Sequence, residues 1–163
     1  WLELGLQSIH NRTLDFLNRG HDYQCFLEAY QQAKERGIKV CVHLILGLPG
    51  ESREDILATA EEMARLKIDG VKLHLLHVLA GTPLGELYQQ GKIEMFEMQE
   101  YVELAVDVIE RLPPETLIQR LTGDGPRHIL LAPLWSMNKW EVLNAIDDEL
   151  ARRGTVQGEK YRG

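Results

Sequence analysis

The run Ile38-Lys39-Val40-Cys41-Val42-His43-Leu44-Ile45-Leu46, followed by Gly47-Leu48-Pro49-Gly50, decides the fold class. Its first nine residues are mostly aliphatic, which is typical of a parallel strand covered on both faces. The glycines and the proline then turn the chain. Ser52, with Asp55 three residues later, predicts a capped start for a helix that extends to about Leu66. The segment is therefore a strand, a tight turn and a helix.

Similar units lie on both sides of this segment. Leu2–Ser8 alternates apolar and polar residues, which is the period of a half-buried strand. Helical spacing follows it and ends at Gly37. Val71–Leu79 is another strand-like run, and Phe96–Leu112 has the apolar stripe of a helix. Connections of this length join parallel strands, so the sequence predicts an α/β fold with three parallel βα units.

The pattern changes after Leu112, where Pro113 and Pro114 end the last regular helix. Short strands are predicted near Thr116–Thr122 and His128–Leu131, and a helix over Trp135–Arg153. We therefore predict two parts, the three βα units over residues 1–112 and a mixed or helical extension over residues 113–163.

Composition describes an ordinary acidic protein of 163 residues, with 18 Lys and Arg against 25 Asp and Glu, a net charge of −7 and 44% apolar residues. No apolar stretch approaches the roughly 20 residues that span a bilayer, so no membrane segment is expected. Without a basic stripe, nucleic-acid binding by this segment is unsupported, although RNA as a substrate stays open. Cys25 and Cys41, the two cysteines, suit a reducing cytoplasm.

The chain opens at Trp1 without an initiator Met and directly inside the strand Leu2–Ser8. We expect it to be a fragment of a longer protein. An unpaired strand edge invites pairing with another strand, so we also expect self-association through Leu2–Ser8.

The period of two places polar residues of all three strands on one face. Polar groups facing inward need hydrogen-bonding partners, which indicates a polar lumen with a site at the C-terminal strand ends. Two chemistries follow from the residues alone: Lys72 as a Schiff-base nucleophile, or a metal site made by Glu3, His43 and His74. A non-catalytic interaction module is a third alternative. The lumen face contains Glu3, Gly5 and Gln7, then Cys41, His43, Ile45 and Gly47, then Lys72 and His74.

Four short motifs, in this order and spacing, resemble the C-terminal half of a radical S-adenosylmethionine (radical SAM) core. The likeness is to the branch that contains the Elongator radical SAM subunit and oxygen-independent coproporphyrinogen oxidase. Ala132–Trp135 matches a bacterial subfamily whose members share an Ala-Pro-Leu-Trp segment. The motifs are Glu3-Leu4-Gly5-Leu6-Gln7-Ser8, Asn18-Arg19-Gly20-His21, Leu44-Ile45-Leu46-Gly47-Leu48-Pro49-Gly50-Glu51 and Val78-Leu79-Ala80-Gly81-Thr82-Pro83-Leu84.

The resemblance implies that the three strands are the fourth to sixth of an incomplete (β/α)6 barrel. It implies a [4Fe–4S] cluster that reductively cleaves S-adenosylmethionine, and a 5′-deoxyadenosyl radical that abstracts hydrogen from a substrate. It also implies contacts to S-adenosylmethionine from Gln7 and from Arg19, twelve residues later. The further cofactor contacts that it implies are His43, Ile45, Ser8, Gly47, Pro49 and Leu79.

The cluster ligands implied by the resemblance are three closely spaced cysteines, and this chain has no such motif. We therefore expect them upstream of Trp1. By itself, the chain is expected to bind no cluster and to have no radical activity. The sequence does not identify the substrate.

Overall fold

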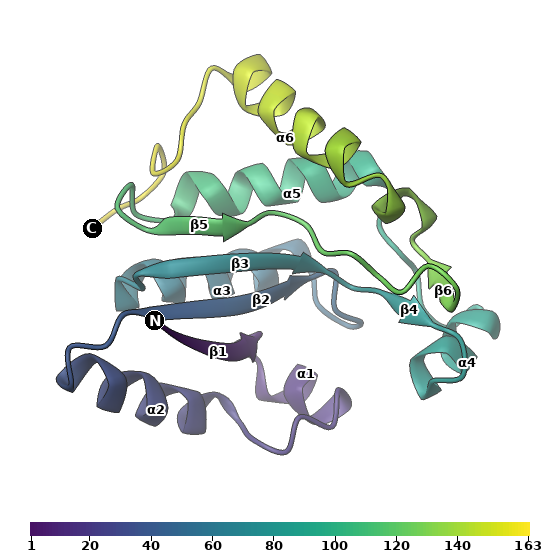
Figure 1. Cartoon of the computed structure of the whole chain (residues 1–163), viewed down its shortest axis with the longest axis horizontal. Coiled ribbons are helices and arrows are strands. Elements are labelled where there is room, and N and C mark those ends of the chain that lie inside the picture. The colour runs from purple at the N-terminus through teal and green to yellow at the C-terminus, as the bar shows by residue number, and fades with distance from the viewer.

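Four parallel strands form the main sheet, in the order β1-β2-β3-β5, and a two-stranded antiparallel sheet pairs β4 with β6 (Figure 1). The structure is a computed structural model that describes residues 1–163. The elements are β1 Leu2–Gln7, α1 Asn11–Phe16, α2 Tyr23–Glu35, β2 Val40–Leu46, α3 Arg53–Leu66, β3 Gly70–Leu75, β4 Val78–Leu79, α4 Pro83–Gln89, α5 Met98–Arg111, β5 Leu117–Arg120, β6 Leu130–Ala132, a 3-10 turn Leu134–Met137 and α6 Lys139–Arg153.

The predicted α/β fold with parallel βα units is confirmed. Figure 1 shows β1, β2, β3 and β5 pointing the same way, with α3 behind the strands and no helix over the near face of β1–β3. The apolar positions of the strands pack against the helices in one continuous core, as the period of two predicted. This core includes Leu6, Val42, Leu44, Val71 and Leu73.

Local sequence explains where the helices begin. The Ser52 hydroxyl accepts from the backbone N–H of Asp55, and the Asp55 carboxylate accepts from that of Ser52, so α3 starts with the predicted capping box. Asp22 caps α2 and Thr82 caps α4 in the same way, by accepting backbone N–H groups.

One predicted strand is wrong in its extent. Val71–Leu79 does not continue as one strand, because β3 ends at Leu75 and the chain leaves the main sheet before β4. Val78 and Leu79 pair with Ala132 and Leu130 of β6 instead. An aliphatic run of this length does not reveal by itself that two different sheets share it.

Residues beyond Leu112 add to the same sheet and core. β5 pairs with β3 as the fourth parallel strand, and Val142 and Ile146 of α6 are buried in the core that the β strands build. The boundary after Leu112 stays a prediction. None of the helices combines the length and the hydropathy that crossing a membrane requires.

Candidate functional site at the strand ends

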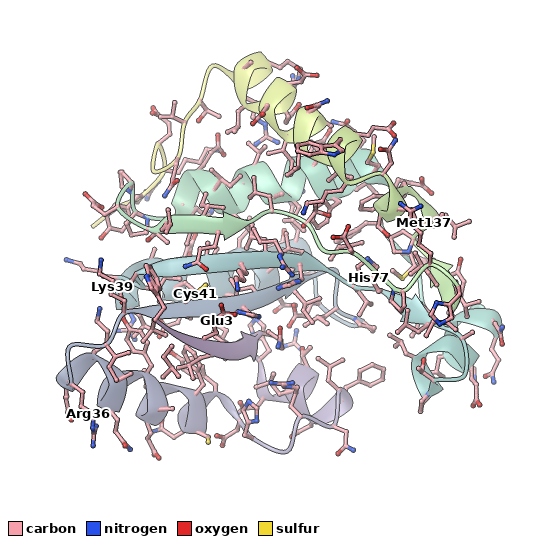
Figure 2. The ribbon with its side chains drawn as sticks, in the orientation of Figure 1. Glu3, Arg36, Lys39, Cys41, His77 and Met137 are labelled. Atoms are coloured by element: carbon pink, nitrogen blue, oxygen red, sulfur yellow. The ribbon has the colours of Figure 1, made fainter.

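The uncovered face of the sheet has a charged cluster that joins β1, β2 and β3. Lys72 Nζ donates to Glu3 Oε1 at 2.6 Å, and His43 Nε2 lies 2.8 Å from Glu3 Oε2. The hydrogen bond from Lys72, and then that from His43, lower the pKa of Glu3. Glu3 lies on this near face in Figure 2. The polar face predicted from the alternation is therefore real, and its charges are paired across the strands.

His74 lies next to this cluster, with its ring centroid 5.3 Å from that of His43. Burial, and then electrostatic interactions with Arg120, His43, Lys72 and His77, lower its pKa to about 4, so it is neutral at pH 7. His74 Nε2 is shielded from solvent and has no hydrogen-bond partner. An unpaired buried nitrogen is unusual, because leaving such a group unsatisfied is costly.

At the end of β1, Gln7 and Arg19 meet over Gly5. A Cβ atom placed on Gly5 would lie 2.9 Å from Gln7 Nε2 and 3.1 Å from Arg19 Nη2. Arg19 Nη2 donates to the Gly5 carbonyl at 2.9 Å, while its buried Nε has no partner. The structure therefore brings together two residues that stand twelve positions apart and leaves one guanidinium nitrogen unused.

The conformation of Gln7 departs from the simple alternation used to predict its face. Its φ of 73° lies in the left-handed region, and the register with β2 skips from Gly5 to Gln7. The strand is thus bulged at its last residue. A non-glycine residue held in that region marks a position that its surroundings over-determine, and such positions cluster at functional sites.

Ser8 lies directly beyond this bulge and is fully buried. Its hydroxyl donates to the Glu51 carboxylate and accepts from the backbone N–H of His10. Ser8 therefore joins the end of β1 to the turn after β2. Glu51 was not among the predicted site residues, although it closes the Gly47–Glu51 motif, and this structural role could not be read from a single motif.

The turn after β2 presents Gly47 and Pro49 at the same edge. Gly47 has a φ of 84°, and a Cβ atom there would lie 3.0 Å from the Phe96 ring, so the turn needs glycine both for its conformation and for its packing. Ile45 precedes it on the uncovered face, where it is half-buried and pairs in register with His74.

Leu79 is placed differently from the prediction. It was expected at the end of the third strand, whereas the structure puts it in β4 of the second sheet. Its carbonyl accepts from the Thr82 hydroxyl at 2.8 Å. A Cβ atom on Gly85 would lie only 2.3 Å from that carbonyl oxygen, so α4 is held very close to β4.

The loop Gly123-Asp124-Gly125 lies against two histidines. Gly123 lies against His74, with a Cβ atom there 3.2 Å from Nδ1, and Gly125 lies equally close to His77. His77 Nε2 is 3.2 Å from the Ser136 hydroxyl. Because Ser136 donates its proton to the Pro133 carbonyl, His77 must be the donor of this bond. The two glycines were the available signal, since a side chain at either position would press on a histidine ring.

The two alternative chemistries lose their support. No group of three His, Cys, Asp or Glu side chains is arranged to hold a metal ion, so the metal site of Glu3, His43 and His74 is wrong. Glu3 and His43 are joined by a hydrogen bond instead, and His74 lies beside His43 without a bond to either. A Schiff-base lysine needs a free amine facing a carbonyl substrate, whereas Lys72 is held by the Glu3 carboxylate.

Comparison with known families matches two adjoining models. Residues 1–63 match the radical SAM superfamily, and residues 68–152 match the radical SAM C-terminal domain. The chain belongs to the radical SAM superfamily. The first model ends within the last turn of α3 and the second begins just before β3, so both contribute strands to the one parallel sheet.

Similar proteins occur in bacteria and in a eukaryote. YtqA of Bacillus subtilis is 46% identical over 162 residues, covering 99% of this chain and 50% of the relative. YhcC of Escherichia coli K12 is 42% identical over 158 residues, covering 97% and 51%. Elongator complex protein 3 of Schizosaccharomyces pombe is 32% identical over 151 residues, covering 90% and 28%.

A solved structure agrees with the fold. The archaeal Methanocaldococcus infernus Elp3 with an N-terminal deletion has a TM-score of 0.82 and 25% identity, and the match covers 95% of this chain and 36% of that one. The predicted half of a partial radical SAM barrel is thereby confirmed as a fold class. The chain spans about half the length of YtqA and YhcC.

The two cofactors typical of radical SAM proteins fit this chain differently. An iron–sulfur cluster needs several thiolate ligands close together. This chain has two cysteines on different elements, Cys25 exposed on α2 and Cys41 buried in β2. The chain therefore does not offer a cluster site. S-adenosylmethionine fits better, because Gln7 and Arg19 meet over Gly5 and offer hydrogen-bonding groups to a polar ligand, including the unpaired Arg19 Nε.

Proposed function

We propose that this chain forms the S-adenosylmethionine-binding half of a radical SAM enzyme. The observation that carries the proposal is the meeting of Gln7 and Arg19 over Gly5, with the Arg19 Nε buried and unused. A guanidinium can bind a carboxylate through two parallel hydrogen bonds, and the amide of Gln7 can both donate and accept. S-adenosylmethionine offers an amino acid group with that polarity.

The remaining predicted contacts have roles that follow from their position. Ile45 presents an apolar surface on the uncovered face, which suits a flat ring, and the turn through Gly47 and Pro49 lies at the same strand end. Ser8 fixes the end of β1 through Glu51. His43 is held by Glu3 and supports the floor of the site. Leu79 is the weakest of these contacts, because it lies in the second sheet.

When bound with a reduced cluster, S-adenosylmethionine supplies a 5′-deoxyadenosyl radical that abstracts hydrogen from the substrate. This chain's residues would bind and orient the cofactor, and the [4Fe–4S] cluster would be held by a segment outside this chain. The residues of this chain do not identify the substrate or the product. We place the enzyme in the cytoplasm, where its two cysteines would stay free thiols.

Binding of S-adenosylmethionine to the chain tests the proposal. Isothermal titration should show that Arg19→Ala and Gln7→Ala each weaken binding by about tenfold, the loss of one or two hydrogen bonds. Arg36→Ala and Gln31→Ala are the matched controls, because Gln31 is exposed on α2 and Arg36 is exposed directly after it. Both should bind as the unchanged chain does. Unaltered binding by both test variants would refute the assignment.

Activity is measured in a protein extended to the length of its relatives. Anaerobic release of 5′-deoxyadenosine should fall in Arg19→Ala and Gln7→Ala, whereas the α2 controls should keep the unchanged rate. Equal release by all four variants would show that the strand end does not serve the reaction.

The free edge of β1 supports the predicted self-association. β1 has a strand on one side only, and its first residue, Leu2, is exposed. We propose that this edge pairs with another strand: a second copy when the chain is alone, and the rest of the barrel in the longer protein. Light scattering that shows a monomer at high concentration would contradict pairing between copies.

A further inference from the structure

A hollow of about 580 Å³ lies between β5 and α6. We name it the β5–α6 hollow, and its volume falls within the range typical of small-molecule sites. β5 forms the edge of the sheet opposite to β1, so the hollow is separate from the site built by Gln7 and Arg19. Its lining includes Ile118, Arg120, Thr122, Lys139, Trp140 and Leu143.

The hollow contains polar groups that the protein does not use. Thr122 is only 1% exposed, yet its hydroxyl has no hydrogen-bond partner. Arg120 forms no ion pair, and Lys139 Nζ lies 4.0 Å from the Asp124 carboxylate, a loose and exposed contact. Buried hydroxyls are normally paired, and two cations with so little opposing charge favour an anion.

The same hollow has an aromatic wall. Trp140 is 73% exposed, although tryptophan gains more than any other side chain from contact with an apolar surface. Leu143 and Ile118 continue the apolar surface beside it. An exposed indole next to cations is a combination that suits the stacking of a planar ring bearing a negative charge.

We propose that the β5–α6 hollow binds a nucleotide-like ligand, whose planar ring stacks on Trp140 and whose anionic group is bound by Arg120 and Lys139. The Thr122 hydroxyl provides a neutral hydrogen-bond partner deeper in the hollow. The net charge of −7 repels anions in general, so binding depends on these two local cations. This site is distinct from the proposed S-adenosylmethionine site.

The hollow also communicates with the uncovered face of the sheet. Arg120 is in register with Lys72. Burial, and then electrostatic interactions with Arg120 and with His43, Lys72 and His77, lower the pKa of His74. An anion bound to Arg120 offsets its positive charge, so the pKa of His74 rises when the hollow is filled.

Adenosine monophosphate (AMP) is the probe, with adenosine and inorganic phosphate as its separate parts. In equilibrium titrations at fixed ionic strength, AMP should bind at least tenfold more tightly than either part. Trp140→Ala and Arg120→Gln should each weaken AMP binding by about tenfold, and Thr122→Val by a smaller factor. Trp1→Ala and Arg36→Gln, exposed residues of the same types elsewhere, are the controls and should change it less than twofold.

The outcomes separate this proposal from that for S-adenosylmethionine. Gln7→Ala should leave AMP binding unchanged, and NMR should show the His74 ring titrating at higher pH once AMP is bound. If AMP does not bind, binds equally to Trp140→Ala and Arg120→Gln, or leaves the His74 titration unmoved, the proposal is overturned. If Gln7→Ala and Arg19→Ala abolish AMP binding instead, AMP occupies the strand-end site, and only the second site is refuted.

Discussion

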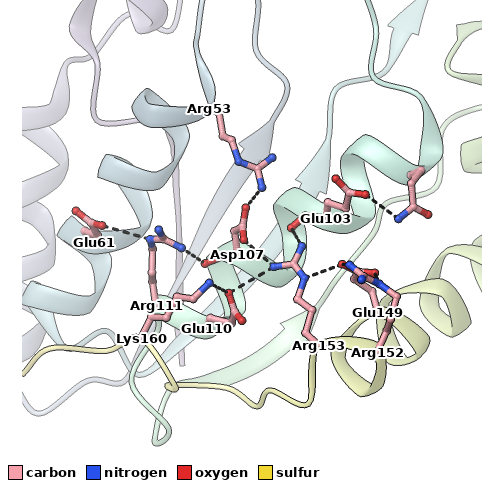
Figure 3. Close-up of polar contacts among 11 residues, drawn as sticks. Arg53, Glu61, Glu103, Asp107, Glu110, Arg111, Glu149, Arg152, Arg153 and Lys160 are labelled. Atoms are coloured by element: carbon pink, nitrogen blue, oxygen red, sulfur yellow. Dashed lines mark hydrogen bonds and ion pairs between the residues drawn. The ribbon is translucent and has the colours of Figure 1, made fainter.

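Two regions of the molecule treat their buried polar groups in opposite ways. Between α3, α5 and α6, Asp107, Glu110 and Glu149 are carboxylates with side chains only 9%, 3% and 4% exposed, and each is paired with two or more cations (Figure 3). Arg153 from the end of α6 reaches all three.

At the strand ends and along β5, by contrast, shielded polar atoms lack partners. They are Arg19 Nε, His74 Nε2 and Thr122 Oγ1, three of the four such atoms in the protein. The fourth, Thr155 Oγ1, lies in the C-terminal segment behind the sheet. The network in which every carboxylate is paired has a structural role, because it attaches the C-terminal residues to α3 and α5. Unsaturated buried groups need another explanation, and binding of a ligand provides one.

The largest effect on the free energy of unfolding is expected from removing a cation of the paired network. Arg153→Ala leaves three buried carboxylates without a shared cation, so the free energy of unfolding should fall by about 3–5 kcal/mol. Urea unfolding measures it. Arg152→Ala is the matched control, because Arg152 is exposed and pairs with Glu149 alone, and its loss should be clearly smaller. Equal losses in the two variants would mean that the network does not act through Arg153.

Where the buried polar atoms lack partners, a glycine-to-alanine substitution should change ligand binding without changing stability. Gly5→Ala puts a methyl group against the flexible ends of Gln7 and Arg19, so it should weaken S-adenosylmethionine binding by about tenfold with little change in the urea midpoint. Gly85→Ala is the counterpart, because its methyl group meets the Leu79 backbone and should destabilise the protein by about 1–3 kcal/mol. Gly5→Ala with unaltered binding would remove Gln7 and Arg19 from the site.

This contrast also shows which features the sequence could predict. The apolar and polar faces of the strands, and the capping box of Ser52 and Asp55, depend on nearest neighbours and a fixed period, and both are confirmed. The pairing of Gln7 with Arg19 came from resemblance to a family, because no local rule joins residues twelve positions apart.

The features that were missed depend on distant parts of the chain. The break between β3 and β4 requires β6, more than fifty residues away, to pair with Leu79. The glycines of Gly123–Gly125 predict a turn wherever they stand, and only the folded chain shows that they lie against His74 and His77. The β5–α6 hollow similarly needs a strand and a helix that local patterns describe separately.

The smallest expected effect is on the pH dependence of stability, to which His74 and Glu149 contribute in different pH ranges. His74 has its folded pKa lowered from 6.5 to about 4, so the unfolded chain binds a proton in this interval and the folded chain does not. Stability from His74 is therefore lost as the pH falls from about 6.5 to 4. Hydrogen bonds from Arg152, and then from Arg153, lower the pKa of Glu149 to about 2 despite its burial. Its contribution is lost only below about pH 4.5.

Urea unfolding between pH 7 and pH 2 should resolve these two windows. His74→Gln should flatten the upper window, by about 1 kcal/mol for a half-buried imidazole, and leave the lower one intact. Glu149→Gln should flatten the lower window and leave the upper one intact. If His74→Gln left the upper window unchanged, His74 would be solvated in the folded chain, and its unpaired Nε2 would no longer indicate a site prepared for a ligand.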